Sequence, residues 1–316
     1  MFTYIIPFGK TFDDVGFTYK IPDFLKSGIK LGQIVEFELK NEITYGVIYE
    51  FVDLNIENTF VIKEILSIKN DFVFISNYRL ELLKFISKNY FTPIHNSLSL
   101  FIPKNLIDKV KKEKIDLYKQ NLYKYNYDFP LELTSKQQDI YENILKSENN
   151  KILLFGVTGS GKTEIYIKLI KKYLDEGKQT LFLIPEIILG NQIYTKIKKV
   201  FGDDVIILNS TITETQKTKY FLDIYHNNAK IILGTRSSLF YPYNNLGLII
   251  IDEEHDNSYI SDQSPRYNAV EIANKISELN NSKLLLASGT PSVNSMYKGI
   301  KKEYNLLNLL DKYKKN

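Results

Sequence analysis

Cysteine is absent from this 316-residue sequence, and histidine occurs at only three positions. Without a thiol, neither a disulfide nor a thiolate metal site can form. His95, His226 and His255 are not spaced in the way that zinc ligands are spaced. The sequence therefore excludes a disulfide scaffold, and we expect no zinc site in this chain.

Long apolar runs are also missing. No stretch approaches the ~18 consecutive apolar residues of a membrane span, and the start, Met1-Phe2-Thr3-Tyr4, lacks the basic and apolar regions of a signal peptide. We therefore expect a cytoplasmic protein with no membrane partner. The net charge of +4 is too small to indicate an anionic partner by itself. With 44% apolar and 25% charged residues, the composition is that of a folded chain.

Three regions of the sequence differ in pattern. Residues 1–102 contain short strands such as 33–39 and 45–51, and then an apolar helix near 80–87, which predicts a small β-rich domain. Residues 103–130 are rich in lysine and tyrosine, which is typical of a linker. In residues 131–316, short apolar runs alternate with helical stretches, which predicts an α/β lobe with a parallel sheet. The runs are 152–155, 180–184, 205–208, 231–234, 248–251 and 284–287.

A glycine-rich segment follows the first of these runs directly. Residues 156–163 read Gly-Val-Thr-Gly-Ser-Gly-Lys-Thr and fit the phosphate-binding pattern G-x-x-x-x-G-K-[ST]. An amphipathic helical stripe follows and ends near Gly177. Glycines let backbone N–H groups face a phosphate, and the helix N-terminus favours negative charge. We predict a nucleotide site made of Gly156, Thr158, Gly159, Ser160, Gly161, Lys162 and Thr163, with a chance glycine-rich turn as the alternative.

An acidic sequence ends another of the predicted central strands. Residues 248–255 read Leu-Ile-Ile-Ile-Asp-Glu-Glu-His, and ligands bind at the carboxyl ends of parallel strands. We predict that Asp252 and the Thr163 hydroxyl hold Mg²⁺, and that Glu253 activates the attacking water. Either carboxylate could instead be a solvated strand cap, as we expect for Glu254. His255 is a candidate for sensing the γ-phosphate, although an ordinary hydrogen-bonded histidine is the alternative.

Five further blocks accompany the glycine-rich segment and the acidic strand end. The blocks are Leu133-Thr134-Ser135-Lys136-Gln137, Leu183-Ile184-Pro185-Glu186-Ile187 with Gln192, Gly234-Thr235-Arg236-Ser237-Ser238-Leu239-Phe240, Arg266-Tyr267-Asn268-Ala269 and Ser288-Gly289-Thr290-Pro291-Ser292. Taken together, these segments resemble the primosomal protein N′ (PriA) family of replication-restart helicases over most of the chain. The resemblance implies a P-loop RecA-like helicase lobe with a parallel sheet, preceded by a small β-rich DNA-binding domain, and it implies ATP and Mg²⁺ as cofactors.

The resemblance also implies roles for single residues of these blocks. Gln137 would read adenine, although a glutamine at a helix start is more often simply solvated. Thr235 and Arg236 would contact DNA phosphates, with a structural salt bridge as the alternative for Arg236. The residues implied in coupling the ATP site to DNA are His255, Arg266, Ser288 and Thr290.

The first domain resembles the part of this family that captures the 3′ end of a nascent strand at a fork. Phe17 and Tyr19 would stack on a terminal base, and Lys63 would neutralise a phosphate. Alternatively, Phe17 and Tyr19 are core residues on the two faces of a sheet. The sequence departs from the family pattern at Thr18, where relatives carry an acidic residue, and at residues 38–40, where relatives have Pro-Phe-Gly.

The family resemblance implies a 3′-to-5′ DNA helicase that works in replication restart at stalled forks. Forked DNA, other primosome proteins and single-strand binding protein would be its partners, and the nucleoid its location. The linker is too short for the winged-helix domain of relatives, and we expect a fragment that lacks the second helicase lobe and its zinc region. Two alternatives are an ATP-responsive fork-binding module without motor activity and a different P-loop DNA translocase.

Overall fold

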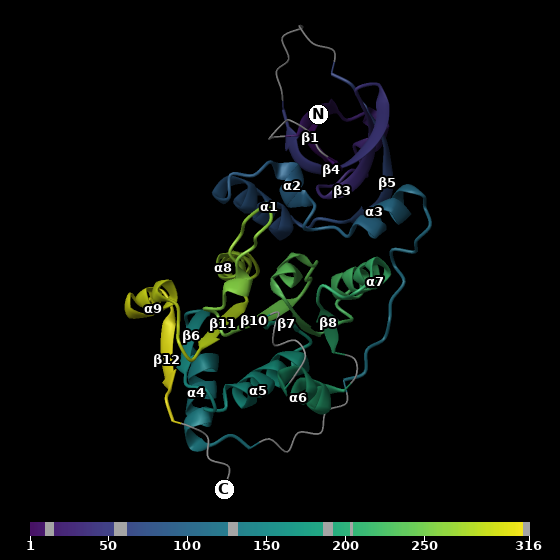
Figure 1. Ribbon diagram of the computed structural model, residues 1–316. Helices are drawn as coiled ribbons and strands as arrows, with labels where there is room; N and C mark the ends of the chain where they lie inside the picture. The colour runs from purple at the N-terminus through teal and green to yellow at the C-terminus, as the bar shows by residue number, and fades with distance from the viewer. Residues whose placement is uncertain (10–15, 54–61, 126–131, 186–191, 203–204, 312–316) are drawn as a thin grey trace.

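The computed structural model describes residues 1–9, 16–53, 62–125, 132–185, 192–202 and 205–311. A smaller β-rich domain lies above a larger α/β lobe, and a layer of short helices lies between them (Figure 1). Glu186 and Ile187 of one predicted block lie outside the described residues. No helix in the described ranges is both long and apolar enough to cross a membrane.

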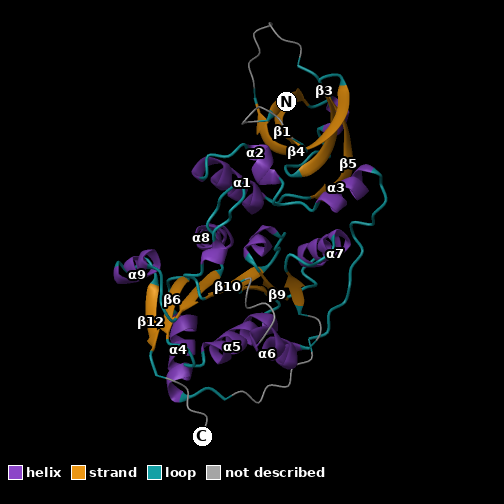
Figure 2. Ribbon diagram, in the orientation of Figure 1, coloured by secondary structure: helices purple, strands orange, loops and turns teal. Residues whose placement is uncertain are grey.

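The β-rich domain is a curved five-stranded sheet, as Figure 2 shows. Its strands pair antiparallel in the order β2-β1-β4-β3-β5. Lys40 and Asn41 both have positive φ values, 53° and 65°, which allow the tight turn between β3 and β4. The strands are β1 Phe2–Pro7, β2 Phe17–Lys20, β3 Gln33–Leu39, β4 Glu42–Val52 and β5 Ile65–Val73, and the helices that follow are α1 Asn77–Asn89, α2 Ile94–Leu98 and α3 Lys104–Lys111.

The larger lobe is built on a seven-stranded parallel sheet with the order β12-β6-β11-β10-β7-β9-β8. All six apolar runs of the sequence lie in or at the end of strands of this sheet, which confirms the prediction of a parallel α/β lobe. The edge strand β12 was not predicted, because most of its residues are only half-buried. The strands are β6 Lys151–Gly156, β7 Gln179–Leu183, β8 Ile206–Leu208, β9 Ile231–Gly234, β10 Leu246–Asp252, β11 Lys283–Ser288 and β12 Asn305–Leu309.

Helices cover both faces of this sheet (Figure 1). The predicted amphipathic helix is α5, and Gly177 just after it has a φ of 69°. Thr134 and Gln137 form a capping box at the start of α4. On one face lie α4 Ser135–Lys146, α5 Lys162–Asp175 and α6 Gln192–Phe201, on the other lie α7 Glu214–Tyr225 and α8 Ala269–Asn280, and α9 Val293–Ile300 lies near the β12 edge.

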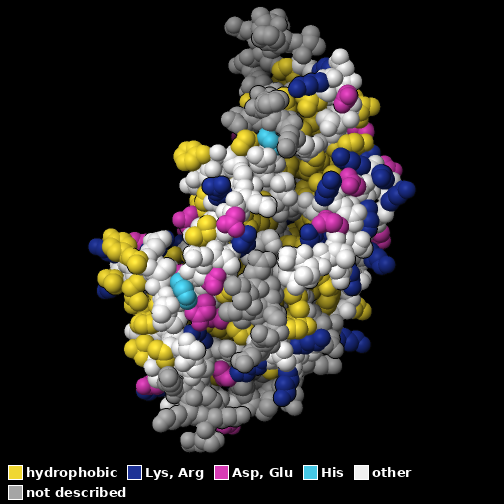
Figure 3. Space-filling model, viewed as in Figure 1, with side chains coloured by type: hydrophobic (Ala, Val, Ile, Leu, Met, Phe, Trp, Pro, Cys, Tyr) yellow, Lys and Arg dark blue, Asp and Glu magenta, His cyan; other side chains and the backbone are white. Residues whose placement is uncertain are grey.

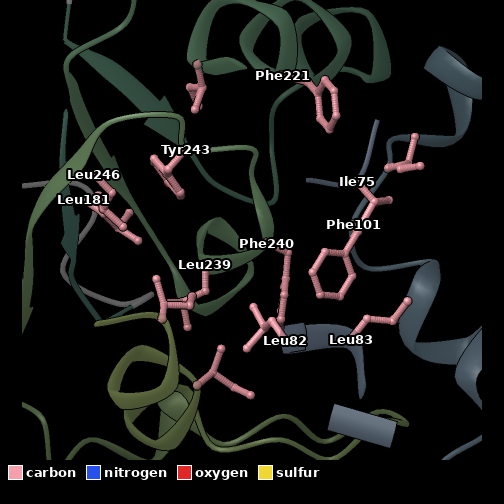
Figure 4. Close-up of a cluster of buried hydrophobic side chains, with 14 of the residues drawn as sticks. Ile75, Leu82, Leu83, Phe101, Leu181, Phe221, Leu239, Phe240, Tyr243 and Leu246 are labelled. Carbon is pink, nitrogen blue, oxygen red and sulfur yellow. The ribbon is translucent and has the colours of Figure 1, made fainter. Parts of the chain in front are cut away.

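The two domains share one hydrophobic core. Ile75, Leu83 and Phe101 of the first domain lie opposite Phe221 and Phe240 of the lobe (Figure 4). The ring centroids of Phe101 and Phe240 are 5.4 Å apart. Because burial of apolar side chains stabilises their contact, the arrangement of the domains is set by packing across this interface.

Arg79 of α1 lies buried in the same interface. Its guanidinium donates hydrogen bonds to the carbonyl oxygens of Phe74 (2.5 Å) and Phe101 (2.5 Å) in the first domain, and of Phe240 (2.7 Å) in the lobe. Burial lowers the pKa of Arg79 to about 10. A buried guanidinium thus ties three backbone segments of two domains together.

The described part of the predicted linker is bound to the lobe rather than loose. It begins with α3, and then the Asn121 amide donates to Asp223 Oδ1 at 2.6 Å while the Tyr123 hydroxyl donates to Asp223 Oδ2 at 2.5 Å. The Tyr125 hydroxyl accepts from the Lys230 backbone N–H at 2.7 Å. His226 Nε2 lies 2.8 Å from the Leu117 carbonyl oxygen, which gives this histidine a structural contact.

Candidate nucleotide and DNA-binding site

The glycine-rich loop has the backbone conformation that its pattern predicts. Gly159 and Gly161 have φ values of 80° and 84°, which side-chain-bearing residues rarely adopt. A Cβ atom at Gly161 would lie 2.0 Å from Gln137 Nε2, so this position requires glycine. The loop leads directly into α5, whose N-terminus favours an anion. Ser160 Oγ is buried and has no hydrogen-bond partner within the described ranges, as expected of a hydroxyl at a ligand site.

Lys162 joins the loop to the acidic strand end. Its ammonium donates to the Gly156 carbonyl oxygen at 2.7 Å and lies 3.3 Å from Glu253 Oε1. The residue is 8% exposed. A bound phosphate would compete for this cation, because the ammonium lies between the loop backbone and the carboxylate of Glu253.

Gln137 is buried against the loop, at 1% exposure. Its amide nitrogen lies 3.3 Å from the carbonyl oxygens of both Ser160 and Gly161, and its Oε1 accepts from the Thr134 backbone N–H at 2.9 Å. The alternative of a solvated glutamine is therefore wrong. The role of Gln137 as the adenine reader stays a prediction.

Asp252 lies at the end of β10 with its carboxylate buried. The Tyr166 hydroxyl donates to Asp252 Oδ1 at 2.8 Å, and the Tyr259 hydroxyl donates to the Asp252 backbone oxygen at 2.7 Å. Burial raises the pKa of the Asp252 carboxyl to about 6, although the Tyr166 hydrogen bond opposes that rise. Sequence reasoning missed Tyr166, yet its position four residues after Lys162 places it on the same side of α5.

This raised pKa predicts a pH dependence of stability in the absence of magnesium and nucleotide. Between the ordinary pKa of 3.8 and about 6, the folded state binds more protons at Asp252 than the unfolded state does. The stabilisation of the folded state by proton binding at Asp252 is therefore fully present below pH 3.8. It is lost as the pH rises through about 6. We expect Asp252→Asn to raise the free energy of unfolding at pH 7 by about 1–3 kcal/mol.

Urea unfolding of both proteins at a series of pH values measures this difference. The stability gain of Asp252→Asn should shrink as the pH falls toward 4, where the wild-type carboxyl is protonated. A gain that does not change with pH would show that the carboxylate is not destabilising when charged. Tyr166→Phe is the matched variant, because it removes the hydroxyl that stabilises the charged carboxylate. We expect this variant to have a lower free energy of unfolding at pH 7 than the unaltered chain.

A hydrogen-bonded network joins the acidic strand end to the Ser-Gly-Thr-Pro-Ser block. His255 Nδ1 lies 2.7 Å from Ser288 Oγ, and His255 Nε2 lies 3.4 Å from Thr290 Oγ1. Glu253 Oε2 accepts from Ser288 Oγ at 3.4 Å and from the Gly289 N–H at 3.3 Å. Thr158, Glu253, His255, Gly289 and Thr290 line a cavity of about 470 Å³. The structure thus brings together His255, Ser288 and Thr290, three of the residues predicted to act in coupling.

Glu254 is buried, at 4% exposure, so the expectation of a solvated strand cap is wrong. Its carboxylate accepts from the Ser292 N–H at 2.6 Å, the Ser292 hydroxyl at 3.0 Å and the Ser295 hydroxyl at 2.9 Å. These donors belong to the start of α9, where a carboxylate is favoured by unpaired N–H groups. Glu254 therefore holds the end of β10 against the block 288–292.

Arg236 makes contacts within the lobe. Its Nη1 donates to the Ser258 carbonyl oxygen at 2.6 Å, and its charge partly offsets the rise that burial causes in the pKa of the nearby Tyr267 hydroxyl. Neither of these partners is a carboxylate, so they do not form the structural salt bridge that was the alternative. Thr235 is buried, and Arg266 is exposed. DNA contact by Thr235 and Arg236, and coupling by Arg266, stay predictions.

Two of the three residues predicted to bind a 3′ end, Tyr19 and Lys63, contact Glu38 of β3. Lys63 Nζ lies 2.7 Å from Glu38 Oε1, and the Tyr19 hydroxyl donates to the Glu38 backbone oxygen at 2.5 Å. Tyr19 is 4% exposed and packs edge-on against Phe37, as in the alternative of a core residue. The two-face part of that alternative is wrong, because Phe17 and Tyr19 pack on one cluster from the same face of β2. Base stacking is thus better suited to the half-buried Phe17, and the site itself stays a prediction.

Comparisons with known proteins match both domains. The 3′ DNA-binding domain family matches residues 5–103, and the DEAD/DEAH box helicase family matches residues 134–298. Proteins called replication restart protein PriA are similar to this chain. The one from Rickettsia prowazekii is 37% identical over 290 residues, or 90% of this chain and 43% of the relative.

Two further relatives carry the same name. The Helicobacter pylori protein (strain 26695) is 37% identical over 280 residues, or 88% of this chain and 42% of the relative. The Bacillus subtilis protein is 38% identical over 218 residues, or 67% of this chain and 27% of the relative. This chain thus spans less than half the length of these relatives. Because the helicase match covers more than half of the chain, the chain belongs to the DEAD/DEAH box helicase family, with a 3′ DNA-binding domain before its helicase lobe.

Proposed function

We propose that this chain binds ATP in its helicase lobe and the 3′ end of a DNA strand in its first domain, as part of a 3′-to-5′ helicase of replication restart. The observation that carries the proposal is the link from Lys162 through Glu253 to Ser288. This link joins the phosphate loop to the block 288–292. Both belong to a helicase lobe, and a DNA-binding domain precedes that lobe in the chain.

The side chains at the start of α5 and at the end of β10 would supply the chemistry that ATP hydrolysis requires. Thr163 and Asp252 would hold Mg²⁺, which takes one or two protein oxygens and completes its coordination with water and phosphate oxygens. The metal ion would supply charge that stabilises the transferring phosphoryl group. Lys162 would bind the β- and γ-phosphates, and Glu253 would orient the attacking water. Gln137 would select adenine.

Coupling between nucleotide and DNA would run through the block 288–292. His255 contacts both Ser288 and Thr290, while Glu254 holds the start of α9. A γ-phosphate beside Glu253 would therefore change the hydrogen bonds of this block. Thr235, Arg236 and Arg266 would contact or respond to the DNA strand. Forked DNA is the proposed substrate, with other primosome proteins and single-strand binding protein as partners in the nucleoid.

ATP hydrolysis, measured with two forks that differ only at the nascent 3′ end, tests this proposal. One fork carries a 3′-hydroxyl and the other a 3′-phosphate. We expect the hydroxyl fork to bind more tightly and to stimulate turnover more. Stimulation by both forks alike would refute 3′-end recognition and favour another type of DNA translocase. Fork binding that Lys162→Ala leaves unchanged, together with negligible turnover, would instead favour an ATP-responsive binding module.

A further inference from the structure

The net positive charge of the chain resides in one short segment. Residues 104–125 contain seven lysines and three acidic residues, a surplus of four, and the whole chain has 41 basic and 37 acidic residues. The rest of the chain is therefore balanced, with 34 residues of each sign. The segment also lies between the two family matches, because the 3′ DNA-binding domain match ends at residue 103 and the helicase match begins at residue 134. We call residues 104–125 the lysine ridge.

The backbone of the lysine ridge is fixed to both domains. α3 buries Leu106 and Val110 in the core that the domains share. Farther along, Asn121 and Tyr123 both donate to the buried carboxylate of Asp223 on α7. With these anchors facing inward, lysines remain on the outer side. In Figure 3, dark blue side chains gather on the right of the molecule, in the region of α3 and below it.

The charges of the ridge are poorly compensated. Lys112, Lys114 and Lys119 are exposed, and in the described part of the chain none of them forms a salt bridge. Glu113 pairs with Lys69 of β5 at 3.3 Å. The ammonium groups of Lys69 and Lys111 lie 5.7 Å and 5.1 Å from the centre of the Tyr45 ring. Two cations on one ring extend the positive surface from the ridge onto the β-rich domain.

We propose that the lysine ridge is a second DNA-binding surface, distinct from the 3′-end site, and that it contacts the phosphate backbone of a duplex arm. Duplex DNA carries one negative charge per about 1.7 Å of its axis, which suits a row of lysines on an ordered backbone. Surfaces for single strands add aromatic side chains on which bases stack. Here the half-buried Tyr123 and Tyr125 stack on each other and direct their hydroxyls into the lobe, which leaves Tyr118 as the exposed aromatic side chain of the described ridge.

The test is binding of a short, blunt, fluorescent duplex whose 3′ ends both carry phosphate, so that 3′-hydroxyl capture does not contribute. The variant Lys112→Gln/Lys114→Gln/Lys119→Gln is compared with the control Lys146→Gln/Lys301→Gln/Lys302→Gln, which removes three exposed lysines elsewhere. Both variants have the same net charge, +1 against +4 for the unaltered chain. Thermal unfolding checks that both variants remain folded.

We expect the ridge variant to bind the duplex roughly tenfold more weakly at low salt. The slope of log affinity against log salt should fall by about 0.9 for each phosphate that the variant no longer neutralises. The control should bind like the unaltered chain. Equal weakening in both variants would overturn the proposal in favour of a net-charge effect. Unchanged duplex binding would also overturn it, whether or not binding of a single strand were weakened.

Discussion

Alanine in place of Lys162 is expected to weaken ATP binding by roughly 100-fold, because hydrogen bonds to charged groups contribute up to about 3 kcal/mol. Lys162 is the cation that lies between the phosphate loop and the acidic pair. Removing it leaves the phosphates without their main positive partner. Titration with a fluorescent ATP analogue in the presence of magnesium measures the affinity.

Lys172→Ala is the matched control on the same helix. Lys172 forms a surface ion pair with Glu176, and such pairs contribute at most about 1 kcal/mol. This variant should bind ATP like the unaltered chain and unfold at nearly the same temperature. Unchanged ATP affinity in Lys162→Ala would refute the nucleotide site. A loss of the folded state in Lys162→Ala would be detected in the same thermal scan.

Methionine in place of Arg79 is expected to lower the free energy of unfolding by about 2–4 kcal/mol. Two effects oppose each other here. Removing a buried guanidinium relieves the cost of desolvating a charge, but it leaves three buried carbonyl oxygens without this donor, and an unsatisfied buried group costs about 1–3 kcal/mol. We expect the second effect to dominate, because the guanidinium reaches Phe74, Phe101 and Phe240 at 2.5–2.7 Å.

Urea unfolding, followed by both circular dichroism and tyrosine fluorescence, measures this effect. Since Arg79 joins two domains, the variant should also unfold less cooperatively, with the transitions of the two domains separating. Arg79→Lys should not restore stability, because one ammonium lacks the planar fork that serves several acceptors. The control is Lys84→Met on the exposed side of α1. An unfolding curve of Arg79→Met that matches the curve of this control would contradict the proposed role.

The strands and the phosphate loop could be predicted because local patterns determine them. Fully buried parallel strands require continuous apolar runs, and such runs are visible in the sequence. The loop requires glycine where φ is positive, as at Gly161, so its pattern is also visible. The end of α5 near Gly177 follows from the same preference.

Other features depend on residues far apart in the chain. Glu254 follows a strand end, where a carboxylate is ordinarily solvated, and only the packing of α9 buries it. In the sequence, Tyr166 is one more apolar residue of an amphipathic helix. Only the packing of α5 against β10 brings its hydroxyl to Asp252. Phe17 and Tyr19 lie on the same face of β2, as residues two apart in a strand do, and only the tertiary structure buries Tyr19 while it leaves Phe17 half-buried.

The sequence by itself determined that this chain contains an α/β lobe with a nucleotide loop and an acidic strand end. It could do so because backbone conformation and strand burial impose local residue choices. Only the tertiary structure decided how the parts connect. Arg79 lies just before the helix predicted near residues 80–87, and residues 103–130 were predicted to be a linker. Long-range packing placed Arg79 in a shared core and fixed residues 103–125 along the lobe, because contacts between distant segments leave no periodic signal in either segment.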